Sequence, residues 1–367
     1  MLYTLPEYYP MFSCIAGECE DTCCSGWQIV IDEQSLKKYR SVKGPYRRRL
    51  LFSIDPLQKV FRRKSDGSCS HLREDGLCEL YRQVGPASLC KTCRLFPRHV
   101  EEFENVREVT LSLSCPEAAR LILSRPEKVK FKTFEREGAE EEYEDFDELF
   151  YDQLLETRGM IIEKAQDREL SVLQRMASIH MCAEKLQEDY DEGRIFSMPD
   201  TAYSVLEENR TDLPSDAEVY RYMKRVHKLL GRMEFLKKDW PMWLVETGDI
   251  LYSDGKTWKA ISREYAEWEK SIDIDMNIVW EQILVNFIMG EYCGAVYDGE
   301  ILAGCDVCLV HTMMLREMMK VVWMRNGKTA EISDLVDMCV RYTRELEHSQ
   351  TNQKKLQRGI KKLNSLN

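Results

Sequence analysis

The spacing of apolar residues divides the chain into a first third of short elements and a helical remainder. Val109, Leu111 and Leu113 alternate with polar neighbours, which predicts a half-buried strand, and the segment 28–32 predicts another. The residues up to about 120 also hold most of the prolines and show no sustained period. We therefore expect this part to be rich in loops.

The later part of the chain has apolar residues at three- and four-residue steps, which is the period of an α-helix. The range 170–183 shows this period. The residues from Ser215 to Glu218 have the form of a capping box before the apolar stripe of 219–233. Further helices are predicted over 258–272, 277–290, 306–325 and 330–348.

The cysteines follow the same division, because 9 of the 14 lie within the first 115 of the 367 residues. A chain of this length can bury a sufficient core without covalent staples. Its first ten residues have neither the basic nor the apolar region of a signal peptide, so we expect a cytoplasmic protein. Since cytosolic thiols are kept reduced, the cluster indicates metal binding or catalysis and argues against a disulfide framework.

These patterns together predict a mixed, mainly α fold with two domains. Residues 1–125 would form a cysteine-rich, loop-rich, metal-binding domain that holds a metal ion or an iron–sulfur cluster. Residues 126–152 would form a charged junction. Residues 153–367 would form a mainly helical domain suited to substrate docking.

The charge is unevenly distributed around a net value of −11, which argues against nucleic acid as a partner. Residues 37–64 contain eleven lysines and arginines against Asp55 alone, whereas residues 135–152 contain ten acidic residues against Arg136 alone. Both runs suit solvated surfaces. The basic run could also bind an acidic protein or acidic lipid. No run of about 18 apolar residues predicts a membrane span.

The N-terminal cysteines have the spacing of metal ligands. One group reads Cys14-x4-Cys19-x3-Cys23-Cys24, and the candidate ligands of the second group and its extension are Cys69, Cys78, Cys90, Cys93 and Cys115. Four thiolates fill a tetrahedral zinc site or hold a four-iron cluster, so nine cysteines suffice for two sites. The residues alone leave open a catalytic cluster, a structural metal and ordinary buried thiols.

This arrangement of cysteines resembles the flagellin lysine-N-methylase family, which shares the zinc- or iron-chelating domain named for a CxxCxxCC pattern. The resemblance covers about residues 1–120 and includes Trp27, the segment 76–81 and the segment 89–98. The remaining two thirds resemble the family only in length and helical character. The first spacing here is Cys-x4-Cys, so the resemblance does not choose between zinc and iron.

The resemblance implies a bacterial, cytoplasmic enzyme that transfers methyl groups from S-adenosylmethionine to lysine side chains of flagellin or a similar protein. It implies a [4Fe-4S] cluster held by the cysteine-rich motif, with zinc as the alternative metal. Peripheral membrane association and an oligomeric state are further expectations of the resemblance.

Two familiar cofactor signatures are absent from the sequence. It lacks the Cys-x3-Cys-x2-Cys of radical-adenosylmethionine enzymes, and no Gly-x-Gly-x-x-Gly follows a predicted strand. Adenosylmethionine would then have to be held in another way. One hypothesis is chelation by an iron left open in a three-cysteine cluster, with Arg94 or Arg98 pairing with the carboxylate.

The acceptor chemistry adds a second set of candidates. A lysine must lose a proton before it accepts a methyl group, and Tyr9 and Asp21 are candidate catalytic residues near the cysteines. Trp27 could border the cationic sulfur or amine through its ring.

Two further groups of residues suit a helical core. We interpret Cys305, Cys308 and His311, at three-residue steps, as buried helix positions, and the methionines of 313–324 as core packing, with an adaptable groove as the alternative. Two other function classes stay open for the whole chain: a non-catalytic, zinc-stabilised interaction module, and another metal-dependent enzyme that modifies peptides.

Overall fold

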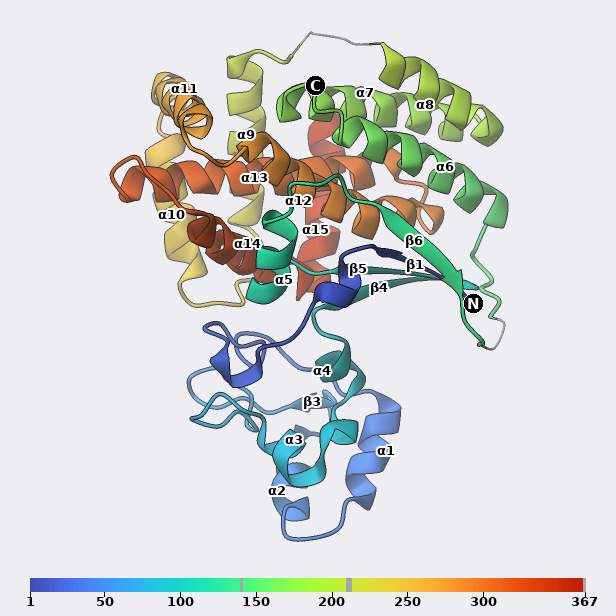
Figure 1. Cartoon of the computed structure of the whole chain (residues 1–367), viewed down its shortest axis with the longest axis vertical. Helices are drawn as coiled ribbons and strands as arrows, with labels where there is room; N and C mark the ends of the chain where they lie inside the picture. The colour runs from blue at the N-terminus through green and yellow to red at the C-terminus, as the bar shows by residue number, and fades with distance from the viewer. Residues whose placement is uncertain (139–140, 209–212, 366–367) are drawn as a thin grey trace.

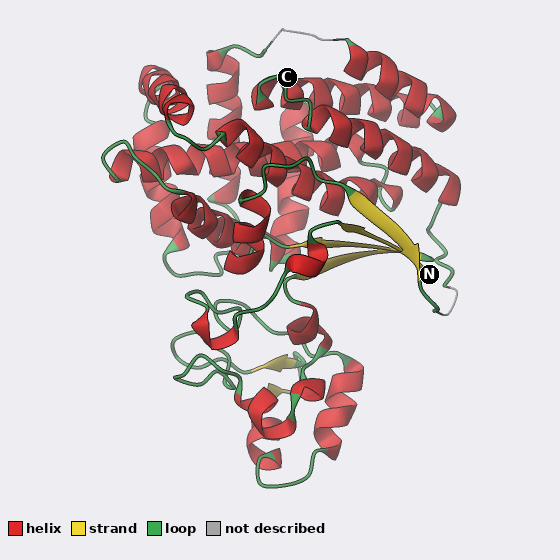
Figure 2. Cartoon of the chain, viewed as in Figure 1, coloured by secondary structure: helices red, strands yellow, loops and turns green. Residues whose placement is uncertain are grey.

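The computed structural model describes residues 1–138, 141–208 and 213–365. A small lobe, the residues between 12 and 97, lies below a larger body (Figure 1). Loops dominate the small lobe and helices dominate the body (Figure 2). The predicted fold class, mixed and mainly helical with a cysteine-rich N-terminal part, is confirmed.

A four-stranded sheet forms the floor of the body, above the small lobe (Figure 1). Its strands lie in the order β4-β5-β1-β6, with β4 antiparallel to β5, β5 parallel to β1 and β1 antiparallel to β6. The bounds are β1 Leu2–Pro6, β4 Arg98–Phe103, β5 Val106–Leu111 and β6 Phe131–Glu135. The chain therefore enters the sheet first, leaves it to build the small lobe and returns at β4.

The small lobe consists of short elements around the two-stranded sheet of β2 and β3. Asp32 begins its longest helix, because its side chain accepts a hydrogen bond from the backbone of Ser35 at 2.9 Å. The elements near and within the lobe are η1 Tyr9–Met11, η2 Ala16–Glu18, α1 Glu33–Ser41, α2 Arg47–Phe52, β2 Ile54–Asp55, β3 Val60–Phe61, α3 Glu79–Val84, η3 Pro86–Ser88 and α4 Lys91–Leu95.

The body packs its helices around two that are buried along most of their length, α12 and α13. Helices that are apolar on all sides require neighbours on all sides, and α13 packs against α7, α12, α14 and α15. The bounds are α5 Pro116–Leu123, α6 Glu148–Ala165, α7 Val172–Asp191, η4 Ile195–Ser197, α8 Met198–Glu207, α9 Asp216–Leu230, α10 Trp240–Leu251, α11 Gly255–Ser271, α12 Met276–Glu291, η5 Tyr292–Val296, α13 Ile301–Arg325, α14 Ile332–Glu347 and α15 Gln350–Asn364.

The six predicted helices are confirmed as α7, α9, α11, α12, α13 and α14. The predicted capping box is present at α9, where Ser215 and Glu218 each bond the other's backbone N–H. The methionines Met314, Met318 and Met319 of α13 are buried in the core, as are Cys305 and Cys308, so core packing is confirmed for both groups.

The two predicted strands had different outcomes. The alternation at 109–113 belongs to β5, which starts three residues earlier and ends at Leu111. The strand predicted over 28–32 is wrong, because this segment forms only an isolated bridge from Val30 to Val60. Its alternation is real, with Ile29 and Ile31 buried and Val30 exposed. However, β3 is too short to extend the ladder.

The hydrophobic residues form two separate clusters. The smaller one lies between Ile29 and Cys90, within the small lobe. The larger one combines Tyr8 and residues from Phe103 onward with the helices. The predicted junction 126–152 contains β6 and the start of α6. Most of its described acidic residues are exposed, and Glu140 lies outside the described residues. The predicted folding units 1–125 and 153–367 stay a prediction.

No helix in the described ranges is both long enough and apolar enough to cross a bilayer.

A buried histidine makes the stability of the body depend on pH. His311 of α13 stacks on Phe287 with ring centroids 4.7 Å apart, and its Nδ1 lies 3.0 Å from the Tyr342 hydroxyl. Burial lowers the pKa of this imidazole to about 3. An exposed histidine has a pKa of about 6.5, so the unfolded chain binds more protons between these two values.

We therefore expect this contribution to be complete above about pH 6.5 and to shrink by about 2 kcal/mol at about pH 5. The variant His311→Gln should lose this part of the pH dependence, because its amide does not titrate. Urea denaturation of both proteins at the two pH values measures the difference. Parallel stability–pH curves for the two proteins would contradict the assignment to His311.

Candidate metal centre between the two lobes

The nine cysteines of the first 115 residues are all free thiols and fall into two neighbouring groups. Five of them lie in or against the hydrophobic cluster of the small lobe; we name these the core cysteines: Cys24, Cys69, Cys78, Cys90 and Cys93. The other four lie close enough together that a thiolate at Cys14 would raise the pKa of each of the other three. We name these the rim cysteines: Cys14, Cys19, Cys23 and Cys115.

The core cysteines come together from four segments of the small lobe. The backbone N–H of Cys69 donates to the carbonyl of Cys24 at 2.7 Å, and an isolated bridge pairs Cys78 with Leu72. Cys90 precedes α4, and the Cys93 thiol one turn later donates a hydrogen bond that lowers the pKa of Cys90. Cys69 and Cys90 are thus buried in the core of the small lobe, and the other three thiols lie half-buried against it.

Cys14, Cys19 and Cys23 lie in turns near the surface, whereas Cys115 lies in the core of the body directly before α5. The backbone N–H of Ala16 donates to Cys14 Sγ at 3.4 Å, and that of Cys19 donates to the carbonyl of Ala16 at 3.2 Å. Gly17 allows this loop to pack closely, because a Cβ there would lie 3.0 Å from the carbonyl oxygen of Asp75. Of the four, Cys14 is exposed and Cys115 is buried.

The two groups meet at the adjacent residues Cys23 and Cys24. Their thiols are hydrogen-bonded; the bond from Cys23 lowers the pKa of Cys24 to about 7 and raises that of Cys23. Within the described ranges, no three His, Cys, Asp or Glu side chains are arranged to share a single metal ion. The donor set itself fits a soft metal or an iron–sulfur cluster, since each group offers at least four sulfur ligands.

Arg344 of α14 links the rim cysteines to the body. Its guanidinium donates to the carboxylate of Asp21 at 2.7 Å, to the Asp21 carbonyl at 2.9 Å and to the Ser114 carbonyl at 2.9 Å. Lys237 adds a second ion pair to Asp21 at 3.2 Å. Burial raises the pKa of Cys19, and the charge of Arg344 opposes that rise. A positive charge from the body therefore lies beside the rim cysteines, where it favours thiolates.

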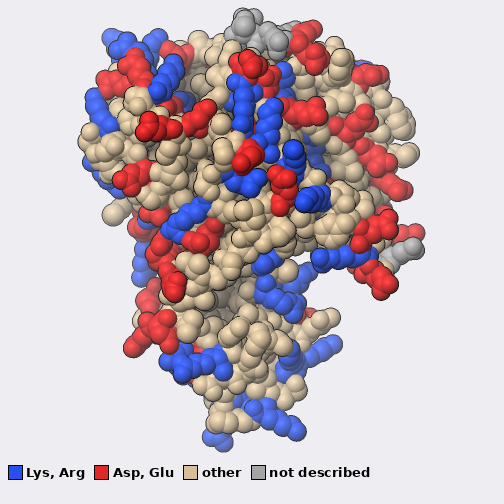
Figure 3. Space-filling view, viewed as in Figure 1, with Lys and Arg blue, Asp and Glu red and all other residues tan. Residues whose placement is uncertain are grey.

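Trp27 forms the aromatic wall of the same region. Its indole N–H donates to the Cys23 carbonyl at 2.8 Å, and its ring stacks on His348 with centroids 4.2 Å apart. Phe96 lies against both rings at 6.1 and 5.9 Å. The surface is hollowed between the two lobes, on the right of the view in Figure 3. Two predicted site residues, Asp21 and Trp27, thus flank Cys23.

The other predicted site residues lie in different surroundings. Arg98 donates to the hydroxyl of Tyr9 at 2.8 Å, and its guanidinium lies 5.4 Å from the centroid of Phe12. Arg94 is exposed on α4, one residue after Cys93. Their predicted roles in catalysis and cofactor binding stay predictions.

A family model described as the FliB lysine N-methylase C-terminal domain matches residues 158–367, which is more than half of the chain. The chain belongs to the FliB lysine N-methylase family. The match falls on the helical body, so it complements the resemblance of the cysteine-rich part, which covers about residues 1–120.

Three curated relatives from Salmonella support this membership. The flagellar biosynthetic protein FliU of Salmonella muenchen is 32% identical over 146 residues, which are 36% of this chain and 85% of that protein. The lysine-N-methylases of Salmonella typhimurium and Salmonella choleraesuis are each 33% identical over 134 residues, 34% of this chain. The match spans only 33% of each methylase. No solved structure matches this member of the family.

The sequence of this family member did not reveal which residues of the body lie beside the rim cysteines. Lys237, Arg344 and His348 lie more than 200 residues from Asp21 and Trp27, the residues of the small lobe that they contact. In the sequence, Arg344 is one arginine within a predicted helix, and the apolar period gives no sign that it is buried. Only the packing of α14 against α5 and the start of the small lobe brings it to Asp21.

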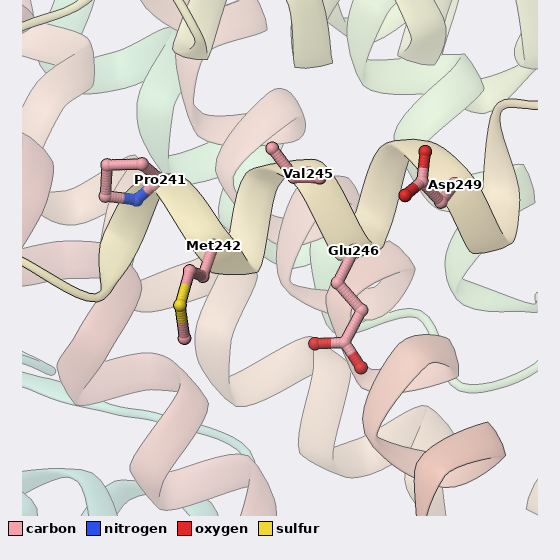
Figure 4. Close-up of a pocket in the computed structure, with 5 residues that line it drawn as sticks. All are labelled: Pro241, Met242, Val245, Glu246 and Asp249. Atoms are coloured by element: carbon pink, nitrogen blue, oxygen red, sulfur yellow. The ribbon is translucent and has the colours of Figure 1, made fainter.

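A separate apolar strip lies on the outer side of α10. Figure 4 shows Met242 and Val245 on the same stretch of this helix as Glu246 and Asp249. Met242 is 71% exposed and Val245 is 63% exposed. The strip contributes no residue to the region around Cys23.

Proposed function

We propose that this protein transfers methyl groups from S-adenosylmethionine to lysine side chains of flagellin, with the help of an iron–sulfur cluster held by the rim cysteines. The main support for this proposal is the position of the rim cysteines in a chain that belongs to a lysine N-methylase family. They lie where the small lobe meets the body, beside Asp21, Trp27 and Arg344. A reaction on a protein side chain requires a centre that a partner can reach.

The two groups of cysteines would have different tasks. The core cysteines lie within the small lobe's own hydrophobic cluster, which suits a structural metal that stabilises the lobe. Three of the four rim cysteines are exposed or half-buried, which suits a centre that contacts substrates. A cluster held by three of the rim thiolates would leave one iron able to bind the amino and carboxylate groups of adenosylmethionine.

The chain's own residues would orient the reactants. Arg344 and Lys237 hold Asp21 and therefore the loop that contains Cys19 and Cys23. The face of Trp27 offers a surface for a cationic sulfur or a methylated amine. An acceptor lysine has a reference pKa of about 10.4, so forming its neutral amine at pH 7 requires about 4.6 kcal/mol unless the site removes the proton.

The basic stretch 37–64 lies in the small lobe, where Figure 3 shows lysine and arginine at the lower tip. Phe52 is 80% exposed and Leu57 is 92% exposed in this stretch. A basic surface with exposed apolar side chains fits the predicted contact with an acidic lipid surface or an acidic protein partner.

Anaerobic purification with metal analysis tests the proposed centre. We expect a brown protein that contains iron and inorganic sulfide and absorbs light at about 400 nm. A colourless protein with stoichiometric zinc and no iron would support a zinc-stabilised interaction module and contradict the cluster.

Co-expression with flagellin tests the activity. Mass spectrometry should find methylated lysines on flagellin only when the chain is present. Modified peptides without added methyl groups would instead support a different metal-dependent modifying enzyme.

A further inference from the structure

The strand β6 lies at one edge of the four-stranded sheet, and β1 is its neighbour within the sheet. Figure 1 shows β6 along the outer side of the sheet, above the small lobe. A strand at an edge presents a row of backbone N–H and carbonyl groups with which another strand can pair. The proposed metal centre uses no residue of β6.

Hydrogen bonds at both ends of β6 show which of its residues face β1. The N–H of Glu7 donates to the carbonyl of Lys130 at 2.8 Å, and the N–H of Arg136 donates to the carbonyl of Met1 at 2.9 Å. The register between the two strands is continuous, and the bonds of an antiparallel ladder alternate from residue to residue. The even-numbered residues of 130–136 therefore bond to β1, and the odd-numbered residues point their N–H and carbonyl groups away from it.

Phe131, Thr133 and Glu135 are the residues whose backbone groups point outward from the sheet. Within the described ranges, these N–H and carbonyl groups have no hydrogen-bond partner. Thr133 and Glu135 are exposed, which leaves this part of the edge accessible. The opposite edge differs, because the carbonyl of Glu102 on β4 accepts a hydrogen bond from the Tyr297 hydroxyl at 2.7 Å. The sheet is therefore open to a further strand at β6.

The segment that contains this edge is strongly basic. Residues 128–136 hold a single acidic residue, Glu135, against these exposed basic residues: Lys128, Lys130, Lys132 and Arg136. Lysines on an edge strand prevent the pairing of identical edges, because a second copy of β6 would place like charges opposite each other. The same charges favour a strand with acidic side chains. The charge of the edge thus selects an acidic partner over a second copy of this chain.

An aromatic pair separates the positive charges on one face of the edge. Side chains alternate between the two faces of a strand, so Lys132, Phe134 and Arg136 lie on the same face. Phe134 stacks on Tyr3 of β1 with ring centroids 5.9 Å apart, and the Arg136 guanidinium lies 5.0 Å from the Phe134 centroid. A strand that pairs with β6 would place its own alternate side chains opposite these residues. The complementary sequence has an acidic, an apolar and a second acidic residue at every other position, in either chain direction.

We propose that β6 is the docking site for an extended acidic segment of a partner protein, which adds to the sheet as a further strand. The backbone of this segment pairs with the outward N–H and carbonyl groups of Phe131, Thr133 and Glu135. Its acidic side chains lie opposite the basic groups of the edge, and its apolar side chain lies opposite Phe134. The contact requires no methyl transfer, so the proposal is independent of the proposed function.

Binding of a short peptide to the full chain tests this docking site. The probe alternates threonine with glutamate, valine and glutamate, and the comparison peptide has lysine in place of both glutamates. We expect calorimetry to show that the acidic peptide binds at least about tenfold more tightly. Hydrogen exchange within 131–135 should slow when this peptide is bound, because a new strand protects the outward N–H groups. Equal binding of the two peptides, no binding of either, or unchanged exchange in this segment would overturn the proposal.

Thr133→Pro tests the backbone pairing, with Thr133→Val as the matched control. Proline removes the outward N–H of this residue and leaves the bonds of Lys132 and Phe134 to β1 in place. We expect Thr133→Pro to bind the acidic peptide at least about tenfold more weakly and Thr133→Val to bind it like the wild type. Wild-type affinity of the proline variant would contradict strand addition.

Lys132→Glu tests the charge of the edge and does not depend on how well the proline variant folds. Lys132 is exposed, so the substitution should leave the melting temperature unchanged. We expect the variant to bind the acidic peptide at least about tenfold more weakly and to prefer the lysine peptide. Lys355→Glu on α15 is the matched control, because it changes the net charge by the same amount outside the edge. An unchanged peptide preference of Lys132→Glu would also overturn the proposal.

The oligomeric state of the chain tests the alternative occupant, a second copy. We expect the wild type and Thr133→Pro to sediment alike in analytical ultracentrifugation. A dimer of the wild type that is lost in Thr133→Pro would assign the edge to a second copy of this chain and overturn the acidic partner.

Discussion

Replacing Cys23 with alanine should abolish flagellin methylation and leave the small lobe folded, whereas replacing Cys90 should unfold the lobe. Cys23 is a half-buried rim cysteine beside Trp27, and its loss would remove a ligand of the proposed catalytic cluster. Cys90 is completely buried among the core cysteines. Its loss would remove a ligand of the proposed structural metal from a lobe with a small core.

We expect the methylation rate of Cys23→Ala to fall at least about 100-fold. The variant should also lose iron and the absorbance at about 400 nm. Its far-ultraviolet circular dichroism and its resistance to proteolysis should match the wild type. Cys90→Ala should instead become sensitive to protease between residues 12 and 97. The pair serves as its own control, since each variant removes one thiol from the same lobe. Full methylation by Cys23→Ala, or identical behaviour of the two variants, would contradict the division into rim and core cysteines.

Replacing Arg158 with methionine should destabilise the body by about 3–5 kcal/mol. Arg158 of α6 donates two hydrogen bonds to the carboxylate of Glu108 on the central strand β5. Their side chains are 6% and 2% exposed. The substitution would leave an unpaired carboxylate in the interior, and its desolvation accounts for most of the expected loss.

Urea denaturation measures this loss of stability. Two further variants test whether the unpaired carboxylate causes it. Arg158→Met combined with Glu108→Leu should recover most of the stability, because a buried ion pair replaced on both sides leaves no lone charge. Lys185→Met removes one partner of an exposed pair with Glu188 and should change stability by less than about 1 kcal/mol. An equally small change for Arg158→Met would mean that water reaches the Glu108 carboxylate in solution.

The sequence was most informative where local spacing decides the structure. The capping box at Ser215 and the apolar stripe after it specify α9, because both signals act within a few residues. Spacing was less informative at 28–32, where the predicted strand forms only an isolated bridge although Ile29 and Ile31 are buried. Whether an extended segment becomes a strand depends on the length of its partner, and here that partner is the two-residue strand β3.

The candidate site shows the same limit more clearly. Spacing alone groups Cys24 with Cys14, Cys19 and Cys23 and leaves Cys115 apart. In the structure, Cys24 faces the core cysteines and Cys115 joins the rim. Adjacent residues can point in opposite directions, so the position of a cysteine along the chain does not determine which neighbours its sulfur meets.

The sequence by itself therefore determined the cysteine-rich first part, the helical remainder and the resemblance to a lysine-methylating family. These depend on composition, period and motif, which are local properties. Only the tertiary structure decided which thiols lie together and that Arg344 reaches Asp21. Such contacts join residues up to about 320 positions apart. They form because buried apolar faces bring the helix ends together, and no local pattern encodes that outcome.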